Sequence, residues 1–519
     1  MLRTTLSLVI VLFATSAFAQ HAGHTSGAVN FKVSCSPAAQ VQFNRAVTLL
    51  HHMTYPQARA AFEQTAALDP KCAMAHWGVA MSLFQPLWPT RPGPEARALG
   101  WHEVEQAKAQ PTSPREQLFI AAVEAFYLDP ESDDYWLRIR RWEKAMEKLY
   151  TAFPDDSEAA AFYALAHLAT TPADKITRAN ADRAAEILLR IYRQNPNHPG
   201  AMHYLVHASD VPGRERQLLA ITRKYDSIAP NNPHALHMPT HIYVRVGDWD
   251  GVIRGNLRAA KAALQYPAGE KGEFIWDEFC HAMEYLIYGY LQKGDERSAA
   301  AQLHRLQSTK RLEPSFKTAF HLMSTQARVA LERHAWKEAT QIKLREPAEL
   351  DWDRYPWAEA VGRFARGLGA AHLGNINDAK TESERIKESE AATEKMGEGL
   401  FARNIRMLRL ELDSWIAQVE GQKEQSVALM QEAAALEATT PKHPVTPGPT
   451  LPAEELLGDL LMELKDFRGA LAAYRRSLAS YPQRLNSLKG AAQAGRAMRR
   501  TGNLSNHRGH GGSKSIRQY

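Results

Sequence analysis

Residues Pro452–Pro482 read "PAEELLGDLLMELKDFRGALAAYRRSLASYP", with two apolar-periodic stretches on either side of a turn at Lys465-Asp466. Gly458 and Ala470 are small residues, placed where two helices would cross closely, and Tyr474 is the large residue between them. Small residues let helix backbones approach, a large side chain fills the gap between helices, and proline ends a helix. The segment therefore predicts two antiparallel helices joined by a short turn.

The same organisation recurs along most of the chain. It is clear in "FNRAVTLLHHMTYPQARAAFEQTAALDPKCAMAHWGVAMSL" (Phe43–Leu83). Weaker copies place Gly247-Asp248, Gly294-Asp295 and Gly374-Asn375 at the turn between two helices, where a helix C-terminus favours glycine. These segments resemble tetratricopeptide repeats. The resemblance implies an all-α fold, an α-solenoid of stacked antiparallel helix pairs, and no alternating strand pattern competes with it.

Length and charge agree with a repeat protein and argue against one function class. Beyond about 250–300 residues a single core gives way to several domains or to a solenoid. We expect the repeats over residues 41–502, with the most regular one at about 452–485 and about ten helix pairs at the ~34-residue spacing of such repeats. The net charge is only +6, and basic residues are interspersed with acidic ones. No basic stripe with interleaved aromatic residues is present, which argues against nucleic acid as the partner.

The N-terminus has the pattern of a cleavable signal peptide over residues 1–19. Arg3 gives a positive start, Leu6–Phe13 an apolar centre, and Ala17–Ala19 a small-residue cleavage site. The apolar stretch is too short to span a membrane, and no other apolar run is long enough. We therefore expect a periplasmic or secreted protein. We also expect an N-terminal extension over residues 20–40 and a disordered tail over residues 503–519.

The chain has 3 cysteines, Cys35, Cys72 and Cys280. Export permits disulfides. A bridge between Cys35 and Cys72 would tie the mature N-terminal segment to the first helical hairpin, which would leave Cys280 as the odd cysteine. The alternative is three buried free thiols.

Histidines gather in the central repeats. The segment "PHALHMPTHIYVRVGDWD" (Pro233–Asp250) places His234, His237 and His241 at i, i+3 and i+7, which is one face of a helix. Pro239 interrupts this segment, so the helix either bends there or begins later, with Thr240 as its N-cap. In a solenoid, the first helices of successive pairs line the concave surface. His203 and His207 lie on the preceding first helix and His281 on the following one, so all could face one hollow.

The resemblance to tetratricopeptide-repeat proteins implies a scaffold that binds a protein or peptide partner in its concave groove. Such a scaffold needs no cofactor and no catalytic residue. The candidate groove residues are His234, Tyr243, Arg245, His281 and Glu284.

A second interpretation is a metal-binding protein or a metal-dependent enzyme. Histidine pairs at i, i+4 can bind one ion from adjacent turns, and the candidate ligands are His203, His207, His237 and His241. Zinc, copper or iron would suit imidazole. His234, His281, Glu284 or Asp210 would orient the ligands or act as acid or base. The metalloprotease motif H-E-x-x-H is absent, because tyrosine follows His203.

Two further interpretations remain open. The histidines can be ordinary groups of an inner wall that hydrogen-bond to backbone or carboxylates. The groove can also be filled by the chain's own insertions, because two proline-rich stretches, Gln85–Ala96 and Ala438–Ala453, interrupt the repeat pattern.

Overall fold

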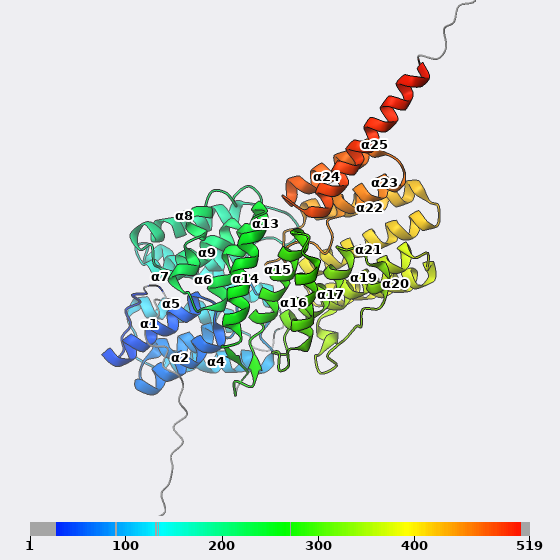
Figure 1. Cartoon of the computed structure of the whole chain (residues 1–519). Coiled ribbons are helices and arrows are strands. Elements are labelled where there is room, and N and C mark those ends of the chain that lie inside the picture. Colours follow the sequence, from blue (N-terminus) through cyan, green and yellow to red (C-terminus); the bar gives the residue numbers. More distant parts are fainter. Residues whose placement is uncertain are drawn as a thin grey trace, which may run out of the picture.

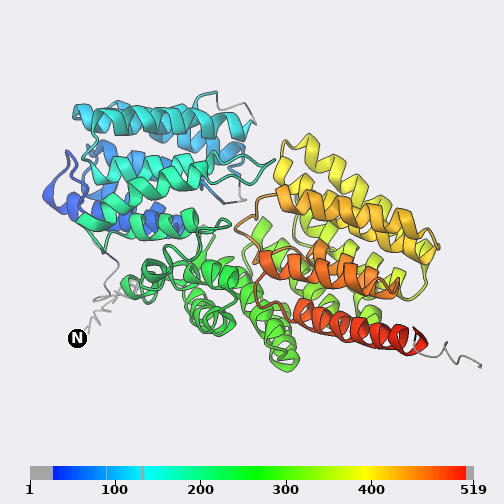
Figure 2. The same ribbon diagram turned by 90° about the horizontal axis from the view of Figure 1, so that it is seen from above.

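The computed structural model describes residues 27, 29–88, 91–129, 132, 134–269 and 271–509, with side chains described as far as residue 500. The expected signal peptide (1–19), the first part of the expected extension and the last ten residues of the chain, 510–519, lie outside the described residues. The described chain is a succession of helices that pack as antiparallel pairs (Figure 1). From above, the N-terminal helices and the C-terminal helices lie at opposite ends, joined by the green middle helices (Figure 2). The predicted α-solenoid is confirmed.

The first part of the solenoid comprises the following helices: α1 (Pro37–His51), α2 (Tyr55–Leu68), α3 (Ala73–Met81), α4 (Pro94–Lys108), α5 (Pro114–Tyr127), α6 (Tyr135–Ala152), α7 (Ser157–Ala169), α8 (Ala179–Gln194), α9 (Pro199–Ser209), α10 (Leu219–Thr222), α11 (Tyr225–Ile228), α12 (Pro233–His237), α13 (Pro239–Val246) and α14 (Trp249–Ala263). A short antiparallel ribbon follows, made of β1 (Pro267–Ala268) and β2 (Phe274–Ile275).

The second part contains one 3-10 turn, η1 (Trp352–Arg354), and these helices: α15 (Glu278–Gln292), α16 (Glu296–Ser308), α17 (Phe316–Leu331), α18 (Trp336–Thr340), α19 (Pro356–His372), α20 (Ile376–Lys395), α21 (Gly399–Val419), α22 (Lys423–Thr439), α23 (Ala453–Glu463), α24 (Phe467–Ser480) and α25 (Leu485–Gly509). Helix α25 continues past residue 502, where we expected the repeats to end. Among the described residues, no helix has the length and apolar content needed to cross a bilayer.

The most regular pair, α23 and α24, shows why small residues recur in the pattern. A Cβ at Gly458 would lie 2.6 Å from the Tyr474 ring, and one at Gly490 would lie 2.3 Å from the same ring. Tyr474 is buried and donates a 2.5 Å hydrogen bond to Asp459. Two glycines on neighbouring helices therefore make the space for one aromatic side chain.

Glycine is also required at a turn between two helices. Gly247 follows α13 with φ +73°, in the left-handed region, as the turn pattern predicts. A Cβ there would lie 2.7 Å from the carbonyl oxygen of Pro482. Trp249, just beyond, donates to the carbonyl oxygen of Gln483 at 2.9 Å. The connection between α24 and α25 thus packs directly on the middle of the solenoid.

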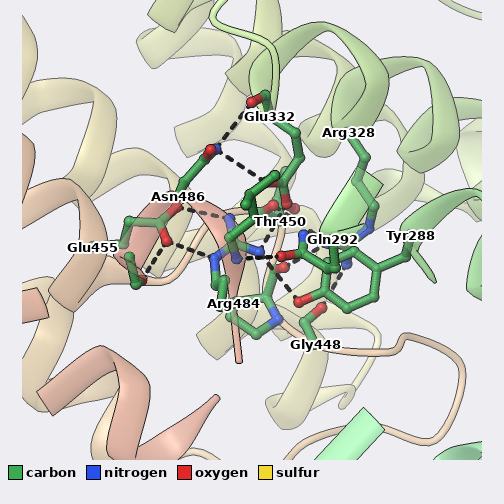
Figure 3. Close-up of polar contacts among 12 residues, drawn as sticks. Tyr288, Gln292, Arg328, Glu332, Gly448, Thr450, Glu455, Arg484 and Asn486 are labelled. Carbon is green, nitrogen blue, oxygen red and sulfur yellow. Dashed lines mark hydrogen bonds and ion pairs between the residues drawn. The ribbon is translucent and has the colours of Figure 1, made fainter. Parts of the chain in front are cut away.

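Arg484 fixes this return of the C-terminal helices (Figure 3). Its guanidinium is fully buried and binds the Glu455 carboxylate through two 2.7 Å hydrogen bonds. It also donates to Glu332 at 2.8 Å and to the Tyr288 hydroxyl at 3.1 Å. Because Glu455 lies on α23, Glu332 caps the end of α17 and Tyr288 lies on α15, one cation joins the last repeats to the centre of the chain.

The N-terminal segment is packed rather than loose before residue 41. Cys35 and Cys72 form a disulfide, and Cys280 is buried and free. Phe31 is fully buried, with ring centroids 5.2 Å from Phe43 and 5.6 Å from Trp77. The apolar core therefore includes part of the stretch that we assigned to an extension.

The fit around Tyr474 can be tested with Gly458→Ala. We expect unfolding free energy to fall by about 1–3 kcal/mol, because the new methyl group overpacks a filled site. Gly495→Ala is the matched control, since it lies within α25 and its nearest contact is an arginine end 3.9 Å away. The free energy of unfolding of the control should rise by up to about 1 kcal/mol, because alanine has a higher helix propensity than glycine. Equal denaturation midpoints for the two variants would contradict the packing argument.

The disulfide closes a loop with a sequence separation of 37 residues. Loop entropy predicts that the double variant Cys35→Ala/Cys72→Ala is destabilised by about 3–4 kcal/mol. Thermal or urea unfolding with and without a reductant measures this effect. The reductant should destabilise the wild type and leave the double variant unchanged; an effect on both would point to another cause.

Candidate metal centre

Six histidines form two groups of three in the middle of the solenoid. The ligating atoms within each group all lie within 4.8 Å of one another. The first group is His203, His207 and His234; the second is His237, His241 and His281. Helix α9 supplies the first two residues, α13 supplies His241 and α15 supplies His281. Helix α12 supplies one histidine to each group, so the groups are neighbours.

The proline in this segment leaves the histidine face intact. Helix α12 ends at His237 and α13 begins at Pro239, with Met238 between them in right-handed helical conformation (φ −52°, ψ −41°). The helical direction therefore continues through the break. Thr240 lies inside α13 and is not its N-cap. His237 and His241 consequently point the same way, with their Nε2 atoms 2.9 Å apart.

Hydrogen bonds fix the protons of two histidines in the first group. His203 Nδ1 lies 2.6 Å from the carbonyl oxygen of His51, and His234 Nδ1 lies 2.9 Å from a Glu278 carboxylate oxygen. Both partners only accept, so each Nδ1 carries the proton and each neutral ring keeps a lone pair on Nε2. These two Nε2 atoms are 3.1 Å apart, and that of His207 is 3.2 Å from that of His203. The lone pairs of His203 and His234 thus face each other, whereas no hydrogen bond of the described residues fixes the proton of His207.

The second group repeats this arrangement. His237 Nδ1 donates to the side-chain oxygen of Asn256 at 2.7 Å, and the Asn256 amide is oriented by its own bond to Val252. His241 Nδ1 donates to Asp210 at 3.0 Å. The Nε2 lone pairs of His237 and His241 therefore meet at the 2.9 Å contact.

A relay of buried groups orients the third member, His281. The carboxylate of Glu284 accepts from His321 Nδ1 and, at 2.9 Å, from Arg328 Nε. His321 Nε2 is then an acceptor, and it lies 3.1 Å from His281 Nδ1. His281 accordingly carries its proton on Nδ1 and keeps the lone pair on Nε2.

Burial keeps five of the six imidazoles neutral. Desolvation, followed by repulsion from neighbouring imidazoles, holds the pKa well below its usual value in His203, His207, His237 and His281. Burial also lowers the pKa of His241, to about 4. Burial alone would raise the pKa of Asp210, but Lys442 and Arg245 hold it well below its usual value. Neutral rings with charged supporting carboxylates are the protonation states that metal ligation needs.

A third cluster, His51 with Glu158 and His198, differs chemically. The backbone N–H of Ala201 donates to His198 Nδ1 at 3.1 Å, so the proton of His198 is on Nε2, which faces Glu158 at 3.3 Å. His51 Nε2 lies 2.7 Å from the other Glu158 oxygen. Protons here point at a carboxylate and not at one another's ring nitrogens. The carbonyl of His51 contacts the first histidine group, where it orients His203.

Both histidine groups line one chamber. The chamber has a volume of about 20 Å³, and its walls include His207 and His234 from one group and His241 and His281 from the other. A volume above about 10–15 Å³ is enough for one water-sized occupant. One small ligand in this chamber would contact both groups.

A larger cavity of about 570 Å³ adjoins the chamber. Trp88, His207 and His443 line both. Its walls come from both ends of the solenoid, and the two proline-rich insertions contribute residues 87, 88 and 91 and residues 438 and 440–444. In Figure 2 the connection after α22 reaches from the C-terminal helices toward the middle of the molecule. The chain's own insertions therefore fill and cover part of the groove.

Arg328 holds the covering insertion in place. Its guanidinium donates to the carbonyl oxygen of Gly448 at 2.6 Å (Figure 3). It also donates to the carbonyl oxygen of Pro449 at 2.8 Å and to the Thr446 hydroxyl at 2.9 Å. The same guanidinium binds Glu284, which orients His321. The cover and the histidine cluster are thus joined by one side chain.

The structure regroups the residues chosen from the sequence. The four expected ligands do not form one four-histidine site but divide between two groups, which His234 and His281 complete. Those two side chains are 4 % exposed and Glu284 is 0 % exposed, so a protein partner has no access to them. Tyr243 and Arg245 are half-buried.

Sequence analysis missed several supporting groups. Asn256 and His321 lie on α14 and α17, and each is one of several polar residues on its helix, so no spacing distinguished it. Glu278 stands three residues before His281, on the same helix face, and this spacing could have identified it. His443 lies in the second proline-rich insertion, where no periodicity exists.

Comparison with known proteins adds only distant likenesses. No protein-family model and no curated protein sequence matches the chain. Among solved structures, the APC/C hetero-tetramer Cut9–Hcn1 has a TM-score of 0.40 at 10% identity, over 88% of this chain and 76% of that one. A Rap protein complexed with competence and sporulation factor has a TM-score of 0.43 at 10% identity, over 88% of this chain and 100% of that one. The TPR domain of P58(IPK) has a TM-score of 0.20 at 10% identity, over 89% of this chain and 99% of that one. At these scores the likeness carries no argument, and the repeat architecture stands on the helix pairs themselves.

Proposed function

We propose that this protein binds two transition-metal ions, one in each three-histidine group. The observation that carries the proposal is the facing of imidazole Nε2 atoms, 3.1 Å apart in His203 and His234 and 2.9 Å apart in His237 and His241. Their protons are held on the opposite ring nitrogens. Facing lone pairs repel each other, whereas a cation between them would be coordinated by both.

The alternatives to a metal ion are costly. Moving a proton to Nε2 would direct the Nδ1 lone pair at a carbonyl or carboxylate oxygen. Protonating His203, His237 or His241 would place a charge where burial already disfavours it. The distances also agree with ligation. Two nitrogens bound to one ion at 2.0–2.1 Å lie about 2.9 Å apart at a right angle and about 3.3 Å apart at the tetrahedral angle.

The donor set limits the choice of metal. Three imidazoles favour zinc, copper, iron or nickel over magnesium or calcium, which prefer oxygen ligands. Three protein ligands also leave a coordination position open, as in catalytic rather than structural zinc sites. Because both groups line the same chamber, the open positions would face a shared ligand. An ion bound there supplies Lewis acidity or redox chemistry. We therefore infer a metal-dependent enzyme.

The cellular location is a further part of the proposal. The N-terminal sequence has the pattern of an export signal, and a disulfide joins Cys35 to Cys72. Disulfides persist in oxidising compartments. We propose that the metal centre operates in the periplasm or outside the cell.

Binding of a protein or peptide remains the second candidate function. Stacked helix pairs form extended surfaces that commonly bind other chains. Tyr243 and Arg245 are half-buried and remain accessible. A partner would contact such rim residues and not the histidines beneath them.

Metal content tests the proposal directly. The mature wild type, prepared without a histidine tag and loaded with zinc, should hold about two ions per chain by elemental analysis. His203→Ala/His207→Ala should remove one ion, because two of three ligands are lost, and His237→Ala/His241→Ala should remove the other.

The matched control is His102→Ala/His304→Ala, which changes two exposed histidines on α4 and α16. This control variant should keep a zinc content of about two ions per chain. Circular dichroism verifies the fold of each variant. Wild-type protein that holds no zinc after loading, or pair variants that retain full content, would refute the two-site proposal.

The supporting shell gives an independent prediction. Asn256→Leu removes the acceptor that orients His237, so zinc affinity at the second group should fall about 10–100-fold while the first group is unaffected. Asn404→Leu is the matched control, because both asparagines donate to the carbonyl four residues earlier, at 2.8 Å and 2.7 Å. Zinc titration by calorimetry measures both sites. Identical titration curves for the two variants would contradict the role given to Asn256.

A further inference from the structure

The walls of the 570 Å³ cavity are mostly apolar and aromatic. Its volume is in the range of about 300–1,000 Å³ that is usual for small-molecule sites. The apolar wall contains Trp88, Tyr135, Trp136, Leu168 and Ile176. These side chains would contact a molecule with an apolar body mainly through their apolar and aromatic surfaces.

Charge is concentrated at one end, next to the histidine chamber. Asp210 accepts from Arg245 Nε at 2.5 Å and lies 2.9 Å from Lys442 Nζ. Its remaining partner is His241, which is neutral when it donates from Nδ1. One carboxylate thus faces two cations, and both cations line the cavity. Counted as formal charges, the excess at this end is one positive charge, and burial lowers the pKa of the Lys442 ammonium.

The other charged groups of the cavity have partners of their own. Arg91 is neutralised by Glu398 through hydrogen bonds of 2.8 and 3.2 Å. Glu437 is buried, and burial raises its pKa to about 7, so it carries only part of a negative charge at neutral pH. Glu215 is half-buried in the 211–216 turn, where it accepts from the Gly213 amide at 2.8 Å.

Hydrogen-bond donors remain available at the charged end. Arg245 uses Nε and Nη2 on Asp210, and among the described residues nothing accepts from its Nη1. Lys442 donates to Thr446 at 3.2 Å and contacts Asp210, which leaves a third ammonium proton. The backbone N–H of Val445 donates to His443 Nδ1 at 3.0 Å, so the His443 proton is on Nε2. Three donors thus lack an acceptor within the described structure.

We infer that this cavity binds a small organic anion, an aromatic or apolar body with a single carboxylate directed at Lys442, Arg245 and His443. The carboxylate end then lies beside His207, which lines both the cavity and the histidine chamber. The apolar body lies along the tryptophan and tyrosine wall. The claim that this anion is the substrate of the metal centre rests on the proposed function.

Three ligands of one shape test the inference in the metal-free, full-length mature protein. They are 3-phenylpropanoate, its neutral amide 3-phenylpropanamide and the cation 3-phenylpropylamine. Quenching of tryptophan fluorescence and calorimetry report binding, because Trp88 and Trp136 form part of the wall. We expect the acid to bind at least ten-fold more tightly than the amide, and the amine to bind most weakly. An acid that binds no better than its amide would overturn the inference without any variant.

Variants then locate the binding site. Lys442→Met should bring the affinity for the acid close to that for the amide and leave the amide unchanged. Lys293→Met is the matched control, because Lys293 is 46% exposed and pairs with Asp250 on the solenoid surface. Ile176→Trp changes a 39% exposed position of the wall and should weaken the binding of the acid and of the amide equally. Unaltered acid binding in both cavity variants would place the ligand elsewhere and refute the inference.

The metal proposal and the ligand proposal can fail separately. Acid binding to metal-free protein does not require zinc, and zinc content is measured without the acid. Selective acid binding in a protein that takes up no zinc would support the anion site and refute the metal centre. Two zinc ions in a protein that does not distinguish acid from amide would do the reverse.

Discussion

The carboxylate of Glu284 is the constraint on which the centre of this molecule depends. It is fully buried, and it accepts both from His321, which orients His281, and from Arg328, which holds the covering insertion at Gly448. A buried carboxylate is stable only when its charge is compensated, and loss of one partner leaves the other charge uncompensated, at a cost of about 3–5 kcal/mol. The inner imidazole and the outer cover are therefore positioned together. Neither can shift without disturbing an ion pair in a dry interior.

The solenoid supplies the regular part of this arrangement. Spacings of three and four residues direct the histidines of α9, α12 and α13 to one face, and stacking brings that face against α15. The second helices contribute as well, since Asn256 on α14 orients His237. Every orienting partner is an acceptor for Nδ1, so the lone pairs on Nε2 converge. A repeat fold produces this convergence easily, because equivalent positions on successive helices are brought side by side.

Much of this structure could be predicted from the sequence, because its signals are periodic. Gly458, Tyr474 and the turn glycines define helix pairs, and the histidine spacing defines their inner face. The division into two groups of three could not be predicted, because it depends on the register between helices, which side-chain packing sets. His321 was missed for the same reason, since its role exists only through contacts with His281 and Glu284 across two helices. The packing of Phe31 likewise depends on residues far along the chain.

The two proline-rich insertions change what the inner face can do. In an open groove, imidazoles would be solvated and would present a polar surface to another chain. Here residues 87–88 and 443–445 line the chamber, and five of the six histidines are almost fully buried, while His207 is half-buried. Exclusion of water strengthens each electrostatic interaction and makes an unsatisfied lone pair more costly. Burial by the insertions therefore converts a set of ordinary helix-face histidines into a site that gains most by binding a cation. The same insertions also line the adjoining cavity, through which a small molecule would reach this site.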